Sequence, residues 1–363
     1  MKAFFFLHPA GPPEKASYQH NMVGLAEGLK ELGWEVQGNI NYWKQSIDNN
    51  VDYLISASKF NTLNEFDLVL VSSTLWAYNG REILPKEIFT PRANRKFKVV
   101  FEDSTDGFNN PSYLDEFRSF DLVLKSHFSV KRSNPKNFIP WQFSLTSRLI
   151  DYAQPQRFDS RKLKILSNYR VNLQLRLLAE EKVMPLLYAS YPKDSTIDGF
   201  DSSNGNPIDR LFWEQTGRRH YPAYFKRLGS TLVSNAIGGW VEKSITRKQG
   251  IVAKFERKLD QYGLVKYPYD RVFQFDSWRF WESLLAGCAT IHIDFEKYGA
   301  VFPVMPINGL HYIGIDLDEP AKNLEIIKDP KTAYEIGQNG RTWALENYSP
   351  KATATRLLNL LNI

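Results

Sequence analysis

The sequence predicts an α/β protein built from two doubly wound domains. Three observations support this: the chain has 363 residues, 43% of them are hydrophobic, and short apolar runs alternate with longer segments of helical periodicity. A typical domain has roughly 100–200 residues, so two domains are expected. The alternation recurs in both halves, and it is typical of parallel sheets with crossover helices.

In the first half, continuous apolar runs predict strands that are buried on both faces. These runs cover residues 2–8, 67–72, 97–102 and 121–125. Between the first two runs, apolar residues at helical spacing predict a helix over residues 16–32, and Gly33 follows where the helix should end.

A polar, proline-containing stretch near residues 138–161 predicts a linker, after which the pattern restarts. The second half is expected to contain strands over 163–167, 196–200, 263–267, 271–275, 289–294 and 311–316. Helices are expected over 172–187, 277–286, 331–346 and 351–361. Residues 201–222 are rich in Asn, Gly, Asp and Pro and are predicted to be a loop.

Charge and apolar run length exclude several classes of protein. Lys and Arg total 46 against 40 Asp and Glu, a net charge of +6, and the basic groups are short and separated, so no nucleic acid is expected as a partner. No run approaches the ~18–20 apolar residues of a spanning helix, and none at the N-terminus is long enough for a secretory signal. With Cys288 as the single cysteine, a cytoplasmic location is expected.

The loop from His8 to Glu14 precedes the helix predicted over residues 16–32, whose first turns contain His20. A helix N-terminus carries unpaired N–H groups and partial positive charge, so a hydroxyl-rich or anionic ligand can bind there. The loop has one glycine, Gly11, and no Walker lysine, so it is not a phosphate fingerprint. The alternative is a rigid connector in which His8 and His20 make local hydrogen bonds.

Three carboxylates lie at the end of the strand predicted over 97–102. They are Glu102, Asp103 and Asp106, and they could provide a general base or bind sugar hydroxyls. The alternative is that these acidic residues only begin a turn. No histidine accompanies the cluster, and no metal or other cofactor is expected.

In the second half, several arginines either follow a predicted strand or lie in the first turn of a predicted helix. Arg170 and Arg176 come directly after the strand over 163–167, where a planar guanidinium is suited to phosphate oxygens. Further on, Ser277 can cap a helix that carries Arg279 and Glu282 on one face. A carboxylate there can bind the vicinal hydroxyls of a ribose. The alternative is a weak Arg–Glu surface pair.

The segment Arg279-x-x-Glu282-x-Leu-x-Ala-Gly-Cys288 before a strand resembles the donor site of GT-B fold glycosyltransferases of the group 1 type. Residues 24–36, a helix ending in Gly-Trp-Glu-Val, are similar to the corresponding helix of their acceptor domain, and residues 344–361 resemble their closing helices. Residues 167–170 and 262–267 look more like exostosin or fucosyltransferase sequences. Gln274 stands where the retaining branch has a second Glu.

The resemblance implies two Rossmann-like domains facing a central cleft: an acceptor domain over 1–148, a donor domain over 149–345, and a last helix within 346–363 that crosses back. It implies metal-independent transfer from a UDP- or GDP-sugar to a carbohydrate or glycoconjugate, including lipid-linked glycans. The implied donor residues are Arg170, Arg176, Lys266, Ser277, Arg279 and Glu282. The candidate bases are Asp103, Asp106, Glu14 and His20, and the candidate acceptor-binding residues are His8, Gly11, Trp76 and Tyr78.

Two other functions remain open at this point. A nucleotide-sugar epimerase shares the two-domain fold and would consume donor without an acceptor. A binding protein could hold a small polar ligand between two such domains without chemistry. Because acceptors of this class are often lipid-linked, a peripheral contact of Lys131 and Arg132 with the inner face of the membrane is also expected.

Overall fold

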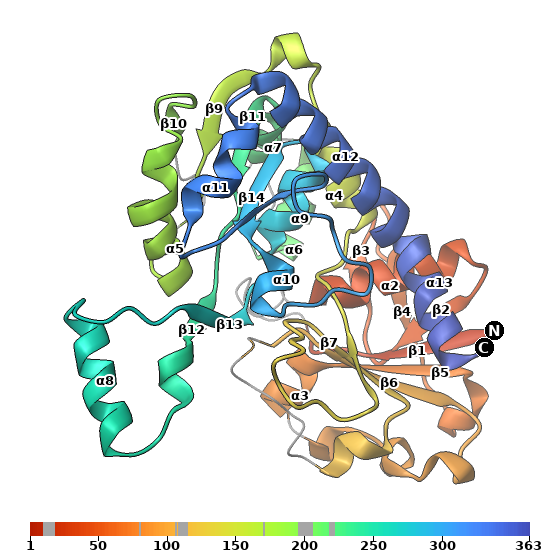
Figure 1. The fold of residues 1–363 in the computed structure, drawn as a ribbon. Coiled ribbons are helices and arrows are strands. Elements are labelled where there is room, and N and C mark those ends of the chain that lie inside the picture. The colour runs from red at the N-terminus through yellow and green to blue at the C-terminus, as the bar shows by residue number, and fades with distance from the viewer. Residues whose placement is uncertain are drawn as a thin grey trace.

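The computed structural model describes residues 1–9, 19–79, 81–105, 107, 115–169, 171–194, 206–217 and 222–363. It has two lobes, each built on a parallel sheet with helices on both sides, and an arm that projects from their junction (Figure 1). The predicted α/β class with two doubly wound units is confirmed.

The first sheet has the strand order β3-β4-β2-β1-β5-β6-β7-β8, and all its pairs are parallel except β3 with β4. The strands are β1 (Lys2–Phe6), β2 (Glu35–Gly38), β3 (Tyr42–Lys44), β4 (Tyr53–Ala57), β5 (Leu68–Ser72), β6 (Lys98–Asp103), β7 (Leu122–Lys125) and β8 (Phe138–Pro140). The helices are α2 (His20–Glu31) and α3 (Ser73–Asn79). Successive residues of β1 pack into different cores on opposite faces, as in a strand covered on both sides.

The second sheet has the order β10-β9-β11-β14-β15 and is entirely parallel. Its strands are β9 (Lys162–Leu166), β10 (Lys193–Asp194), β11 (Thr231–Asn235), β14 (Ala289–Ile293) and β15 (Ile313–Ile315). The helices around it are α4 (Ser147–Tyr152), α5 (Gln174–Leu178), α7 (Pro222–Gly229), α9 (Trp278–Leu285), α10 (Phe295–Tyr298), α11 (Pro320–Leu324) and α12 (Pro330–Tyr348). Helix α6 (Pro207–Gln215) packs instead on the first lobe, where Phe212 shares a core with Trp43.

Three sequence predictions in this half are wrong. The central strand β11 is missed, because its Thr, Ser and Asn side chains hide a strand that is buried along its whole length. Part of the predicted loop is helix α6, which Asn206 caps and Pro207 begins. Residues 263–267 form no strand but lie in the arm that joins β12 (Trp240–Lys243), α8 (Ile251–Gln261) and β13 (Tyr269–Gln274).

The two lobes meet where the strands of the first sheet end. His127, just after β7, accepts hydrogen bonds at Nδ1 from the backbone N–H groups of Phe275 and Asp276, at 3.2 and 3.1 Å. Burial and the nearby Lys125 lower the pKa of His127 to about 3, so its imidazole is neutral and can accept these bonds. In return, Asp276 Oδ2 accepts the N–H of Phe143 at 2.7 Å. The carboxyl edge of the first sheet is therefore fixed against the segment that enters α9.

The last helix, α13 (Pro350–Leu361), packs on α2 of the first lobe after α12 has crossed the second (Figure 1). Ala354, Leu357 and Leu361 share one core with Leu25 and Leu29. The predicted domain boundary between residues 148 and 149 falls inside α4.

Replacing Gly28 by alanine is expected to lower the free energy of unfolding by about 1–3 kcal/mol. A Cβ there would lie 2.0 Å from the carbonyl oxygen of Pro350, so α13 would have to move. Elsewhere in a helix, replacing glycine by alanine raises the free energy of unfolding by roughly 0.5–1 kcal/mol, so the sign of the change distinguishes a close contact from open space. Denaturant unfolding measures the free energy of G28A, with Lys30→Ala on the exposed face of α2 as the control. An unchanged or raised stability for G28A would contradict the packing of α13 on α2.

Candidate functional site

Two arginines lie close together where strands of the second sheet end. Arg176, on α5, has its guanidinium 5.1 Å from the ring of Tyr169, which follows β9. Burial and the positive charge of Arg279, on α9, lower the pKa of Arg176 to about 10. Arg279 has no carboxylate partner among the residues that the structure describes. Two guanidinium groups that repel one another favour an anion between them.

Glu282 lies one turn beyond Arg279 on α9, and its carboxylate is buried. The hydroxyl of Tyr224, on α7, donates a hydrogen bond of 2.9 Å to Glu282 Oε2. Burial and Glu282 raise the pKa of Tyr224 well above its ordinary value, while Arg279 lowers it, so Tyr224 lies near both side chains. Sequence reasoning missed Tyr224, because nothing in its local pattern indicates a contact with a helix so far along the chain. We call Arg176, Tyr224, Arg279 and Glu282 the arginine cluster.

Backbone groups complete this part of the site. Ser277 stands at the N-cap of α9, and its buried hydroxyl has no hydrogen-bond partner in the described part of the chain. The first N–H groups of α9 carry the partial positive charge of a helix N-terminus. Gly238, after β11, lies beside the Arg176 guanidinium, where an added Cβ would be 3.6 Å away in ordinary van der Waals contact. The structure therefore brings three predicted donor residues, Arg176, Arg279 and Glu282, to one place with Ser277 beside them.

Two other predicted donor residues are not part of this cluster as described. Lys266 lies on the arm and lines a separate hollow with Lys182, Lys243 and Lys322. Arg170 falls outside the described residues.

Asp103, a candidate base, lies in a buried ion pair with Lys125, and we assign it a structural role. Its Oδ2 accepts from Lys125 Nζ at 2.7 Å, and its Oδ1 accepts from the N–H and hydroxyl of Thr105 at 3.1 and 2.5 Å. Both members of the Asp103–Lys125 pair are buried. A carboxylate that already accepts these three bonds is poorly placed to take a proton from an acceptor hydroxyl.

Glu102, beside Asp103, is a buried carboxyl group with no cation partner among the residues that the structure describes. Its Oε1 accepts from Asn21 Nδ2 at 2.7 Å, and Asn21 Oδ1 accepts the N–H of Ser144 at 2.8 Å. Burial raises the pKa of Glu102 to about 8. The group is therefore mostly protonated at neutral pH. Sequence reasoning saw Glu102 in the acidic run but did not choose it, because burial is invisible in the local pattern.

Replacing Glu102 by glutamine is expected to flatten the pH dependence of stability. The folded pKa lies above the ordinary 4.5, so this group's contribution is fully present below that value and is lost as the pH rises through about 8. Denaturant unfolding of parent and E102Q at about pH 5, 7 and 9 measures the difference. Identical pH profiles would show that Glu102 is ionised in the folded protein.

The predicted acceptor side is brought together in part. His8, after β1, has its ring 4.9 Å from that of Tyr78 on α3, and Tyr78 is exposed. Trp76 is partly buried, and its ring packs against Phe89, Phe101 and Phe117 at the edge of the core, so its role in stacking on a sugar stays a prediction.

His20 begins α2 and is buried between the rings of Trp43 and Trp278, at 5.4 and 4.8 Å. It therefore contacts the first residue of α9, next to the arginine cluster. Gly11, Glu14 and Asp106 fall outside the described residues.

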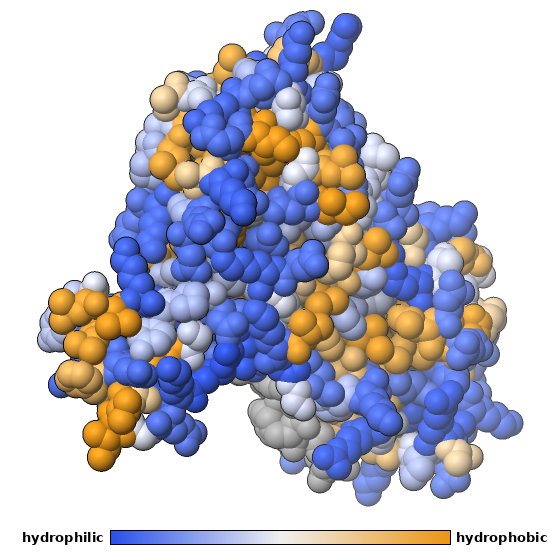
Figure 2. Space-filling model, in the orientation of Figure 1, coloured by the Kyte–Doolittle hydropathy of each residue, from blue (hydrophilic) through white to orange (hydrophobic). Residues whose placement is uncertain are grey.

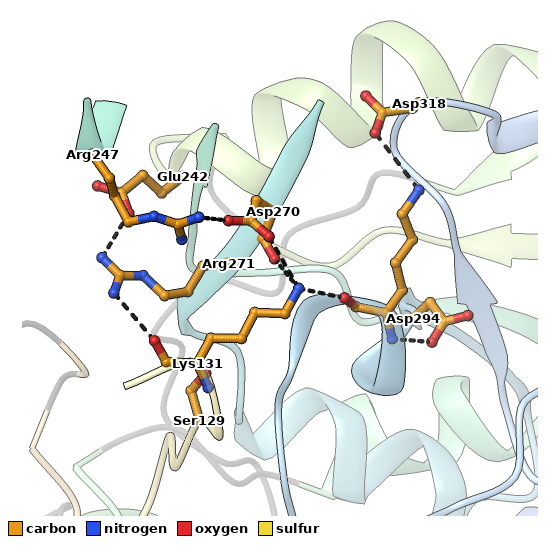
Figure 3. Close-up of polar contacts among 9 residues, drawn as sticks. Ser129, Lys131, Glu242, Arg247, Asp270, Arg271, Asp294 and Asp318 are labelled. Carbon is orange, nitrogen blue, oxygen red and sulfur yellow. Dashed lines mark hydrogen bonds and ion pairs between the residues drawn. The ribbon is translucent and has the colours of Figure 1, made fainter. Parts of the chain in front are cut away.

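Lys131 and Arg132 make contacts with other parts of the chain, and Figure 3 shows those of Lys131. Lys131 Nζ donates to the backbone oxygen and Oδ1 of Asp270, at 2.6 and 3.1 Å, and to the carbonyl of Lys297 at 2.8 Å. Arg132 donates to the carbonyl of Gly107. Both side chains tie parts of the chain to one another, and the contact of this pair with a membrane stays a prediction.

Comparison with solved structures identifies the fold. An alpha-glucosyltransferase in complex with UDP-glucose and DNA containing an abasic site superposes with a TM-score of 0.53 at 10% identity, covering 100% of this chain and 99% of that one. Alpha-glucosyltransferase in complex with UDP and a 13-mer DNA containing a HMU base superposes with a TM-score of 0.51 at 10% sequence identity, covering 100% of both chains. Alpha-glucosyltransferase in complex with UDP superposes with a TM-score of 0.51 at 9% sequence identity, covering 100% of this chain and 99% of that one. The chain has the GT-B glycosyltransferase fold.

The comparisons leave the family open, because no family model and no curated protein matches the sequence. They overturn one expectation. Nucleic acid was excluded because the basic groups are separated, but two of the similar structures hold DNA with UDP or UDP-glucose. A GT-B chain is thus compatible with a nucleic-acid partner.

The described residues contain no group of three or more His, Cys, Asp and Glu side chains that could hold a metal ion. None of their helices is long and apolar enough to cross a bilayer.

Proposed function

We propose that the protein is a glycosyltransferase that takes a sugar from a UDP-sugar and transfers it to a hydroxyl group of a carbohydrate or glycoconjugate. The observation that carries the proposal is the pair Arg176 and Arg279 at the carboxyl edge of the second sheet, where ligands bind in open α/β folds. The GT-B fold adds support, and so do the similar alpha-glucosyltransferases, which hold UDP or UDP-glucose. UDP is therefore the first nucleotide to test.

The arginine cluster would bind the nucleotide diphosphate and stabilise it as a leaving group. Cleavage of the bond between the sugar and the β-phosphate puts negative charge on the phosphate oxygens. Arg176 and Arg279 can neutralise that charge together with the N–H groups that begin α9, and such preorganised stabilisation is usually the largest catalytic term. Glu282, oriented by Tyr224, would accept hydrogen bonds from the ribose hydroxyls. This division of work requires no metal ion.

The acceptor would enter from the first lobe. His8 and Tyr78 offer an imidazole and an exposed ring near the ends of β1 and β5. His20 stands between the lobes, in contact with the start of α9. We propose His8 and His20 as the described candidates for the base that an inverting transfer needs.

The test is incubation of the protein with UDP-, GDP- and dTDP-hexoses, with and without EDTA, followed by measurement of released nucleoside diphosphate. We expect release from a UDP-sugar at a rate that EDTA does not change. Formation of an epimeric nucleotide sugar without release would identify an epimerase instead. Tight binding with neither product, across a panel of acceptors, would identify a binding protein.

A further inference from the structure

The arm formed by β12, α8 and β13 carries an apolar surface that nothing in the described chain covers. It leaves the second lobe at Trp240, returns at Gln274, and holds α8 away from both sheets (Figure 1). Three large apolar side chains of α8 are exposed: Ile251 by 85%, Val252 by 71% and Phe255 by 62%. Tyr262 and Leu264, in the turn that follows, are exposed by 76% and 72%.

The exposed apolar side chains of α8 lie on one side of the helix. Ile251 and Phe255 are spaced by four residues, which places them along one stripe, and Val252 lies beside it. The opposite side contains Ala253, which is buried. Figure 2 shows apolar surface gathered on the arm. Scattered apolar residues on a surface need no explanation, but a cluster of large ones on a projecting helix indicates an interaction site.

Positive charge surrounds the apolar stripe. Residues 244–268 contain six basic and two acidic residues, a net charge of +4 in a chain whose total is +6. The two acidic groups are already paired, Asp260 with Lys243 at 2.8 Å and Glu256 with Lys248 at 3.4 Å.

Three more lysines of this segment, Lys254, Lys258 and Lys266, are exposed. They have no carboxylate partner in the described part of the chain. The apolar side chains and these ammonium groups therefore share one surface.

We propose that this arm docks the protein on an anionic lipid bilayer. Ile251, Val252 and Phe255 would enter the boundary between headgroups and acyl chains, and the lysines would contact lipid phosphates. An amphipathic helix with an apolar face and basic flanks binds such surfaces by burial of apolar area together with electrostatic attraction. A nucleic acid would satisfy the lysines but leave the apolar face in water.

The root of the arm fixes its direction relative to the site. Asp270 of β13 is held by Lys131 of the first lobe, and Arg271 pairs with Glu242 at 2.7 Å (Figure 3). Gly239, which precedes β12, lies so close to Gln274 that an added Cβ would be 1.8 Å from its carbonyl oxygen. A docked arm would therefore hold the junction of the lobes at a set orientation to the membrane, where a membrane-borne acceptor can reach it.

The test is flotation of the intact protein with phosphatidylcholine vesicles that do or do not contain phosphatidylglycerol, at low and high salt. We expect binding only to the anionic vesicles, weakened by salt. The double variant Ile251→Asp/Phe255→Asp should weaken binding at least about tenfold. Lys254→Ser/Lys258→Ser should remove the preference for phosphatidylglycerol. Val51→Asp, at a site exposed by 77% on the first lobe, is the matched control and should bind like the parent.

Three outcomes would overturn the proposal. The first is that the parent protein binds neither the vesicles with phosphatidylglycerol nor those without it. Another is binding to a duplex oligonucleotide that the lysine variant loses and the aspartate variant keeps, which would assign the arm to nucleic acid. The last is a dimer in sedimentation that the aspartate variant converts to a monomer, which would assign the apolar face to a second copy. Because flotation contains no sugar donor, these results are independent of the proposed transferase activity.

Discussion

Replacing Arg176 or Arg279 by alanine is expected to lower kcat/KM for turnover of the UDP-sugar by about 10²–10³-fold. Each guanidinium would stabilise charge that develops on the departing diphosphate, and each lies beside the other in a partly buried site. Removing Arg279 should leave the fold intact, because it has no carboxylate partner among the residues that the structure describes. Initial rates of UDP release across donor concentrations measure the loss.

Two further variants make this result specific to the site. Arg210→Ala removes an exposed arginine that pairs with Glu214 at 3.1 Å along α6, and it should retain parental activity. Arg279→Lys keeps the charge but loses the planar pair of donors, so it should recover only part of the rate. Full activity in R176A and R279A would show that the diphosphate binds elsewhere.

Replacing Lys125 by methionine is expected to lower the free energy of unfolding by about 3–5 kcal/mol. The change leaves the carboxylate of Asp103 buried without its cation, and a single buried charge is strongly unfavourable. The double variant Lys125→Met/Asp103→Leu should regain much of the loss, because it removes both charges. Denaturant unfolding of the three proteins gives the coupling between the two sites.

The surface pair Lys328–Glu325 provides the control. Lys328→Met breaks an exposed i,i+3 contact of 2.6 Å and should change stability by less than about 1 kcal/mol. If instead Asp103→Asn abolished turnover while leaving stability unchanged, Asp103 would be a catalytic base and our reassignment would be wrong.

The strands with continuous apolar runs could be predicted because burial on both faces leaves a local signature. Strand β11 could not, since Ser234 bonds to Ser283 at 2.7 Å and Asn235 to Tyr169, and these polar side chains find partners only in the folded protein. The apolar residues of 263–267 suggest a core strand, but Leu264 is exposed. Periodicity alone does not distinguish a buried apolar residue from an exposed one.

The donor side of the site could be predicted in part for a similar reason. Arg176, Arg279 and Glu282 follow strands or begin a helix, and such positions can be predicted from the sequence. The role of Asp103 could not be predicted, because it depends on the register of two strands that places Asp103 opposite Lys125. Tyr224 and Glu282 likewise meet only through the packing of α7 near α9.

Calorimetric titration of the protein with UDP and with uridine tests the central claim most directly. We predict that UDP binds and uridine binds at least about tenfold more weakly, because the two guanidinium groups hold the diphosphate. The double variant Arg176→Ala/Arg279→Ala should lose the difference between the two ligands. Equal affinity of the parent for UDP and uridine, or unchanged UDP affinity in the double variant, would contradict a donor site at the arginine cluster.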